Sequence, residues 1–266
     1  MPRLQDPKYL LTEQYNNASK LNARLRLHIQ FSTNPYDWFL WVFDQLDLPG
    51  RCRVLELGCG PGDLWLENID RIPEDWEVTV SDFSAGMLQQ SQENLQDKPH
   101  HFAYVIIDVQ SIPYPNNHFD GIIANHVFHH VPRREEALSE IRRVLKRGGH
   151  LYATSAGEKH LIELPKLVSK FDPELADKNQ LERIEFTLES GYAQLSEWFS
   201  EIKTLRQENS LLVTEAEPLV DYVLSSVRLG VGQERREELT SFIERELEAN
   251  DGSIPITKDG GIFIAQ

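Results

Sequence analysis

One stretch decides the fold of this 266-residue chain: Val54-Leu55-Glu56-Leu57-Gly58-Cys59-Gly60-Pro61-Gly62-Asp63. A short apolar run enters a loop with a glycine at every second position, and helix-like residues follow it. Glycine lets the backbone turn tightly and lets a ligand approach the main chain closely. The stretch therefore predicts a buried strand, a ligand-binding loop and a helix start. A plain strand-to-helix turn needs only one or two glycines and explains the pattern less well.

The chain beyond this loop alternates between strand and helix patterns. Gly148-Gly149 is expected to end the last and clearest of these helices as its C-cap. Short loops between alternating strands and helices are typical of a parallel, doubly wound α/β sheet. The expected strands are 53–57, 78–80, 103–107, 119–124 and 150–153, and the expected helices are 63–71, 84–96 and 133–145.

The two flanks break this rhythm. Asp259-Gly260-Gly261 is expected to form a turn into a short last strand at 262–264. Before it, a strand is expected at 202–206 and helices at 219–227 and 233–249. We expect one domain over 1–266, made of a helical N-terminal lid (1–48), a cofactor-binding core (50–156), a helical insertion or lid (157–200) and the rest of the sheet with its helices (201–266).

Composition narrows the function. The net charge of −15 disfavours nucleic acid as a partner, because backbone binding is driven by cations. The sequence has no run of about 18 apolar residues, so we expect no membrane-spanning helix. Its first residues lack the apolar segment of a secretory signal, so we expect no such signal. Cys52 and Cys59 flank a strand and would lie beyond the about 7 Å limit for a disulfide. Reduced thiols are typical of the cytoplasm, and the oligomeric state stays open.

Asp82 lies at the end of the second expected strand, 22 residues after Gly60. A carboxylate at this place can accept hydrogen bonds from two ribose hydroxyls. Nicotinamide cofactor sites share that geometry, so Asp82 indicates a ribose without naming the cofactor. Its alternative role is to cap the helix that follows.

The glycine loop departs from the dinucleotide fingerprint G-x-G-x-x-G, and Asp63 would be a poor neighbour for a pyrophosphate. From Glu56 to Gly62 the pattern E-x-G-x-G-x-G resembles motif I of the class I S-adenosylmethionine-dependent methyltransferases. Segments 106–109, 119–132 and 140–149 follow in the order and spacing of that family. The resemblance covers about residues 50–156 and is closest to the small-molecule, ubiquinone-pathway-like methyltransferases.

This resemblance implies a Rossmann-like seven-stranded sheet, mostly parallel with an antiparallel last strand, and a helical lid. It implies S-adenosyl-L-methionine as the methyl donor and S-adenosyl-L-homocysteine as the product. Asp108 would lie beside the adenine amino group, and Phe83 would cover the ring or else pack in the helix core. The expected cofactor contacts are Glu56, Gly58, Cys59, Gly60, Gly62, Asp82, Phe83, Met87, Asp108, Val109 and Asn125.

Methyl transfer from a sulfonium needs alignment above all, and a base only where the acceptor must lose a proton. His126, His129 and His130 follow the fourth strand and are the candidate bases, although one of them could simply cap the next helix. We expect no metal, since no suitable carboxylate spacing accompanies them.

The small-molecule acceptor is expected to bind under the helical lids. The candidate pocket residues are Tyr15, His28, Phe31, Trp38 and Trp198, each of which could instead be a packing residue. Two other functions stay open. A nicotinamide-dependent oxidoreductase is opposed by Asp63 and by the lack of a Tyr-x-x-x-Lys pair. A non-catalytic module that binds a nucleoside cofactor would keep the same motifs.

Overall fold

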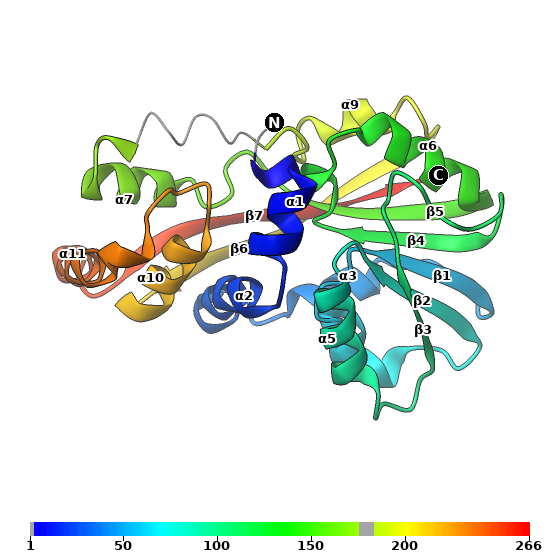
Figure 1. The fold of residues 1–266 in the computed structure, drawn as a ribbon, viewed down its shortest axis with the longest axis horizontal. Helices are drawn as coiled ribbons and strands as arrows, with labels where there is room; N and C mark the ends of the chain where they lie inside the picture. The colour runs from blue at the N-terminus through cyan, green and yellow to red at the C-terminus, as the bar shows by residue number, and fades with distance from the viewer. Residues whose placement is uncertain (1–2, 176–183) are drawn as a thin grey trace.

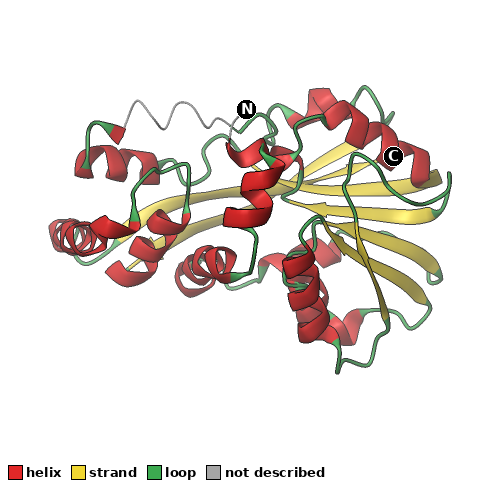
Figure 2. Cartoon of the chain, viewed as in Figure 1, coloured by secondary structure: helices red, strands yellow, loops and turns green. Residues whose placement is uncertain are grey.

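The computed structural model describes residues 3–175 and 184–266. A seven-stranded sheet runs through the whole molecule, in the order β3-β2-β1-β4-β5-β7-β6 (Figures 1 and 2). Only β7 is antiparallel to its neighbours β5 and β6, which confirms the expected mostly parallel sheet with an antiparallel last strand. The strands are β1 (Cys52–Leu57), β2 (Trp76–Asp82), β3 (Phe102–Ile106), β4 (Phe119–Asn125), β5 (Leu145–Ala156), β6 (Ile202–Val213) and β7 (Ile254–Ala265).

Helices cover both faces of the sheet (Figure 2). The expected strand–helix alternation from residue 53 to 156 is present, with the 63–71 segment divided into α4 and a 3-10 turn. The helices are α1 (Pro7–Tyr9), α2 (Ser19–Phe31), α3 (Trp38–Asp44), α4 (Asp63–Glu67), α5 (Ala85–Leu95), α6 (Arg134–Val144), α7 (Glu163–Phe171), α9 (Gly191–Leu195), α10 (Ala216–Ser225) and α11 (Arg236–Ala249). The 3-10 or π turns are η1 (Arg3–Gln5), η2 (Leu10–Gln14), η3 (Ile69–Arg71), η4 (Phe128–His130) and η6 (Gln233–Arg235).

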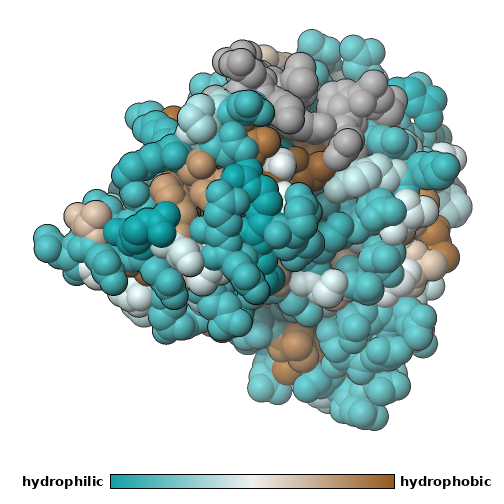
Figure 3. Space-filling view, turned by 60° about the vertical axis from the view of Figure 1, so that its left-hand side comes forward, coloured by the Kyte–Doolittle hydropathy of each residue, from teal (hydrophilic) through white to brown (hydrophobic). Residues whose placement is uncertain are grey.

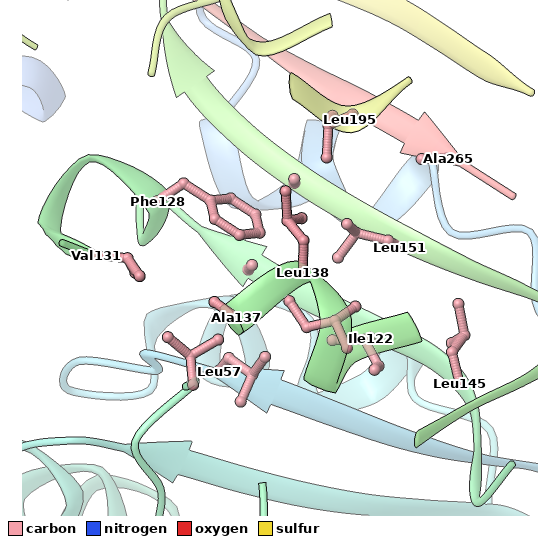
Figure 4. Packing of buried hydrophobic residues seen from close by; sticks show 14 of the residues in the cluster. Leu57, Ile122, Phe128, Val131, Ala137, Leu138, Leu145, Leu151, Leu195 and Ala265 are labelled. Atoms are coloured by element: carbon pink, nitrogen blue, oxygen red, sulfur yellow. The ribbon is translucent and has the colours of Figure 1, made fainter. Parts of the chain in front are cut away.

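Successive residues of the central strands enter different cores, because side chains alternate between the faces of a sheet. Ile122 of β4 packs with the apolar face of α6, and the next residue, Ile123, packs on the opposite side with α3, α4 and α5. Figure 4 shows Ala137 and Leu138 of α6 over Ile122 and Leu151. Burial on both faces explains why these strands read as unbroken apolar runs.

A helical lobe lies beside the main sheet (Figure 1). There β6 and β7 extend past the other strands, and α2, α7, α10 and α11 pack on the extension around a separate core. The surface seen in Figure 3 is mostly hydrophilic, with apolar residues in small patches. None of the described helices is long and apolar enough to cross a membrane.

Two expectations about glycines were wrong. Gly148-Gly149 does not cap α6, which ends at Val144 and leads directly into β5. Asp259-Gly260-Gly261 does not form a turn but lies within the 12-residue strand β7. Glycine is needed there for space, since a Cβ on Gly261 would lie 2.3 Å from the carbonyl oxygen of Leu205.

The flanking segments agree with the sequence only in part. Helical N-terminal residues and the helices around 219–227 and 233–249 are present. The described residues of the 157–200 insertion include the helices α7 and α9, and its residues 176–183 lie outside the described part.

Candidate active site

The glycine loop joins β1 to α4 with a backbone that demands glycine. Gly58, Gly60 and Gly62 have φ angles of 71°, 54° and 90°, a region that other residues rarely adopt. A Cβ on Gly58 would lie 2.6 Å from a methyl carbon of Val127. The loop therefore brings bare backbone next to the segment that follows β4, which suits a ligand held against the main chain.

Asp82 lies beside this loop, at the end of β2. Its Oδ2 accepts a hydrogen bond from the Gly60 amide at 2.9 Å, and its Oδ1 accepts one from the Ser84 amide at 2.8 Å. Burial raises the pKa of this carboxyl to about 6, against the effect of those amides. Each oxygen keeps acceptor capacity for a further donor, so Asp82 fits a pair of ribose hydroxyls. The side chain that caps α5 is that of Ser84.

Glu56 and Cys59 have their polar atoms engaged within the protein. The Glu56 carboxylate accepts from the Trp65 indole at 2.6 Å and from the Asn125 amide at 3.2 Å, and burial raises its pKa to about 7. It thereby links β1 to α4 and β4. The Cys59 thiol is buried and donates to the Gly60 carbonyl, and burial raises its pKa well above the usual value.

The remaining expected cofactor contacts differ in exposure. Phe83 is 38% exposed, so it is not a core residue of α5 and its ring is open to a ligand. The Asp108 carboxylate accepts from the backbone and side-chain amides of Gln110. Met87 and Val109 are both buried, and Val109 belongs to the core that α6 covers.

Five histidines gather where β4 ends, and we call His28, His126, His129, His130 and His160 the histidine cluster. The rings of His129 and His130 are 3.9 Å apart, and those of His28 and His160 are 5.7 Å apart. His126 lies 6.4 Å from His129 and has a φ of 53°, a strained value that is frequent at functional sites.

The histidines of the cluster are neutral at neutral pH. Burial lowers the pKa of His126 and His130 to about 4 and that of His160 to about 3. The same cause lowers the pKa of His28 and His129 well below its usual value. Each neutral imidazole keeps one nitrogen that can accept a hydrogen bond or a proton, but the low pKa values make these rings weak bases at neutral pH.

Tyr15 connects the histidine cluster to Ser84, which follows β2 and Asp82. Its hydroxyl lies 2.9 Å from Nε2 of His130, whose Nδ1 lies 2.9 Å from the Leu4 carbonyl. A carbonyl only accepts, so Nδ1 carries the proton and Tyr15 donates to Nε2. The backbone carbonyl of Tyr15 accepts from the Ser84 hydroxyl at 2.7 Å, two residues from Asp82.

Trp38 and His28 also join this group, whereas Phe31 and Trp198 do not. The Trp38 ring lies 5.5 Å from His126. Phe31 is buried in the core of the helical lobe, and Trp198 lines a groove with α6 on the outside of the sheet. Residues 3–175 and 184–266 contain no group of three His, Cys, Asp or Glu side chains placed to bind a metal.

Four contributors to this site escaped the sequence reasoning: Arg24, His160, Tyr222 and Lys258. Arg24 donates to the Tyr15 hydroxyl at 3.4 Å, and Tyr222 lies 5.9 Å from His28. All four belong to the flanks, where no motif marks a site. The only signal in the sequence was for Arg24, a cation on the same face of α2 as His28.

The sheet order, the glycine loop after β1 and the acid at the end of β2 agree with the Rossmann-like fold that the resemblance to class I methyltransferases implies. Residues 55–153 match the family described as "Methyltransferase domain", so the chain carries a methyltransferase domain rather than a nicotinamide-dependent oxidoreductase domain.

Named relatives agree with this domain. The chain is 32% identical over 131 residues to the ubiquinone/menaquinone biosynthesis C-methyltransferase UbiE of Yersinia enterocolitica, covering 48% of this chain and 52% of the relative. It is 37% identical over 117 residues to UbiE of Azotobacter vinelandii, covering 42% and 46%. The chain thus spans about half the length of the curated relatives it matches.

Solved structures share the fold at low identity. Phosphoethanolamine N-methyltransferase 2 of Haemonchus contortus, in complex with S-adenosyl-L-methionine, has a TM-score of 0.59 and 18% identity over 97% of this chain and 59% of the other. The [4+2]-cyclase SpnF has a TM-score of 0.54 and 16% identity, over 93% and 96%. One fold thus serves a transferase and a cyclase, and the site must decide the chemistry.

Proposed function

We propose that the chain is an S-adenosylmethionine-dependent methyltransferase that methylates a small molecule. One observation carries the proposal. The Tyr15 carbonyl accepts a hydrogen bond from Ser84, two residues after Asp82, and the Tyr15 hydroxyl donates one to His130 of the histidine cluster. A cofactor site and a proton-accepting site therefore lie on the two sides of one residue. Relatives named as C-methyltransferases of quinone biosynthesis, and a structural neighbour in complex with S-adenosyl-L-methionine, support the assignment.

The residues near the glycine loop fit this cofactor. Asp82 would accept from the ribose hydroxyls, and the bare backbone from Gly58 to Gly62 would hold the methionine part. Phe83 would cover the adenine, and Asp108 would accept from its amino group after releasing Gln110. When bound, S-adenosylmethionine supplies a methyl group on a positively charged sulfur.

The chain's own residues would align the acceptor and take up its proton. An acceptor hydroxyl or acidic carbon could pass its proton to the Tyr15 oxygen while Tyr15 passes its own to Nε2 of His130. The imidazolium so formed keeps its Nδ1 hydrogen bond to the Leu4 carbonyl. Burial keeps His130 neutral beforehand, so Nε2 has a free lone pair, and with a pKa of about 4 it would hold the proton only during the transfer. Two free cysteines, Cys52 and Cys59, fit a reducing compartment, and we place the protein in the cytoplasm.

The test is turnover with a labelled donor. The purified chain is incubated with methyl-labelled S-adenosylmethionine and a metabolite library, and S-adenosylhomocysteine release and labelled products are recorded. We expect calorimetric binding of S-adenosylhomocysteine and at least one labelled product. Binding without any product across the library would support the non-catalytic module instead, and failure to bind the cofactor would overturn the proposal.

A further inference from the structure

The histidine cluster lies in a positive field, although the chain as a whole carries a net charge of −15. The charged side chains that lower the pKa values of its five histidines are Arg24, Arg228 and Lys258, all of them cations. No carboxylate of the described residues is among the groups that shift the pKa values of these histidines. A group of cations gathered around one cluster of an acidic protein points to an anionic ligand.

Lys258 is the most informative of these cations. It lies on β7 with its amine largely buried, and burial lowers its pKa. Within the part of the chain that the structure describes, its ammonium group makes no hydrogen bond and no ion pair. The charge of Asp37 opposes this shift and raises the pKa of Lys258. The Asp37 carboxylate itself caps α3, where it accepts hydrogen bonds from the amides of Phe39 and Leu40.

Arg24 supplies a second positive charge from the opposite side, on α2. Its guanidinium donates to the carbonyl of Ser225 and to the hydroxyl of Tyr15, both at 3.4 Å. Gln14 can also accept from it after rotation of its amide. These partners are all neutral, so they hold the side chain in place without cancelling its charge.

His28 lies within reach of both cations. Arg24 precedes it by about one turn of α2, and Lys258 adjoins Asp259, whose amide donates to Nδ1 of His160 at 3.2 Å. The His28 ring stacks on that of His160 and meets the edge of Tyr222. Its Nδ1 is buried and has no hydrogen-bond partner among the described residues. An unsatisfied polar atom of this kind costs free energy unless a ligand or water completes it.

An opening lies close to Arg24. A surface depression of about 240 Å³ is lined by Tyr9, Lys20, Ser225 and Ser226, among others. Ser225 is the residue whose carbonyl holds Arg24. The depression therefore places Lys20 and Ser225, the hydrogen-bond partner of Arg24, at the surface beside α2.

We propose that the methyl acceptor is a small anionic molecule whose carboxylate or phosphate group binds between Lys258 and Arg24, beside Nδ1 of His28. This inference rests on the proposed methyltransferase function and adds the substrate class. The anionic group would pair with two charges that lack an acidic partner. Trp38 and Tyr222 place aromatic rings at the same histidines, so the body of the acceptor would be flat or apolar.

Three small probes that each carry one phenyl ring test the proposal: benzoate, phenyl phosphate and benzamide. Benzamide matches benzoate in shape but is neutral. Their binding is measured by calorimetry on the full chain, with and without saturating S-adenosylhomocysteine. We expect at least one of the anions to bind about tenfold or more tightly than benzamide, since a charge-assisted hydrogen bond contributes that much. The better anion decides between carboxylate and phosphate.

Lys258→Gln and Arg24→Gln should each weaken anion binding about tenfold or more and leave benzamide unaffected. The matched control is Lys203→Gln, which changes an exposed lysine on the neighbouring strand β6 and should alter nothing. Unchanged affinity for S-adenosylhomocysteine shows that each variant is folded.

Three outcomes would overturn the proposal. Equal binding of benzamide and the anions is one, and unchanged anion affinity in both variants is another. The third is a variant that loses affinity for S-adenosylhomocysteine but not for 5′-methylthioadenosine, because the cation would then hold the carboxylate of the cofactor. If anions bind through Lys258 while S-adenosylhomocysteine does not bind at all, the anion site stands and the methyltransferase proposal falls.

Discussion

Cofactor affinity should fall as the pH is lowered through about 6, because of Asp82. Burial is the main reason that the pKa of this carboxyl is raised to about 6, and the amides of Ser84 and Gly60 oppose the shift only in part. Ribose hydroxyls donate to the ionised carboxylate, so ligand binding favours the charged form. Lowering the pH protonates the free protein, and the ligand must then displace a proton in order to bind.

The size of the effect follows from the pKa. At about pH 5, one unit below the pKa, about one Asp82 carboxyl in ten is ionised in the free protein. The affinity for S-adenosylhomocysteine should therefore be about tenfold weaker than at about pH 8, which corresponds to about 1.4 kcal/mol. Removing the side chain costs more: Asp82→Ala should weaken binding by about 1.5–3 kcal/mol at neutral pH.

Calorimetry across this pH range, on three proteins, separates Asp82 from its neighbour. Glu56 also has a pKa raised by burial, to about 7, but its oxygens are engaged by Trp65 and Asn125. The Glu56→Gln variant has no titrating carboxyl at residue 56, and its affinity for S-adenosylhomocysteine should still fall near pH 6. Asp82→Asn should abolish this fall. A fall of the same size in Asp82→Asn would refute the reasoning.

Three further predictions concern the loop, the proton path and the core. Gly58→Ala should destabilise the fold by about 1–3 kcal/mol in denaturant unfolding, because its Cβ would lie 2.6 Å from Val127 at a positive φ; an unchanged midpoint would contradict this. Tyr15→Phe should lower kcat about 100-fold, the low end for a lost acid–base group, and leave S-adenosylhomocysteine affinity within about twofold. An unchanged kcat would remove Tyr15 from the proton path. Phe128→Ala should cost about 3–5 kcal/mol of unfolding free energy, because the ring is fully buried against Phe186; a loss below about 1 kcal/mol would show that the core refills the space.

The sequence predicted the core of the fold because its signals there are local. Buried parallel strands read as apolar runs, and α6 places Ala137, Leu138 and Ile141 on one buried face. The glycine loop and Asp82 are adjacent to strand ends, where such sheets bind ligands. These elements were therefore placed within a few residues.

The errors came from features whose cause is distant in sequence. Gly260 and Gly261 carry the composition of a turn, but they are glycines because Trp38 and the Leu205 carbonyl approach β7 closely. The histidine cluster needs His28 and His160 from the two flanks, and only tertiary packing brings them to His126. Trp198 was expected in the pocket, whereas its segment packs outside the sheet beside α6.

The length of β7 has a mechanical consequence. This one strand pairs with β5 through residues 260–265 and with β6 along its full length, and its other end belongs to the helical lobe. A hinge motion between the lobe and the main sheet would have to break those ladder hydrogen bonds or bend a paired ribbon. Lys258 therefore keeps a fixed distance from the carboxyl ends of β4 and β5. The N-terminal turns that carry Leu4 and Tyr15 are not part of the sheet, so we expect them, rather than Lys258, to move when small molecules exchange.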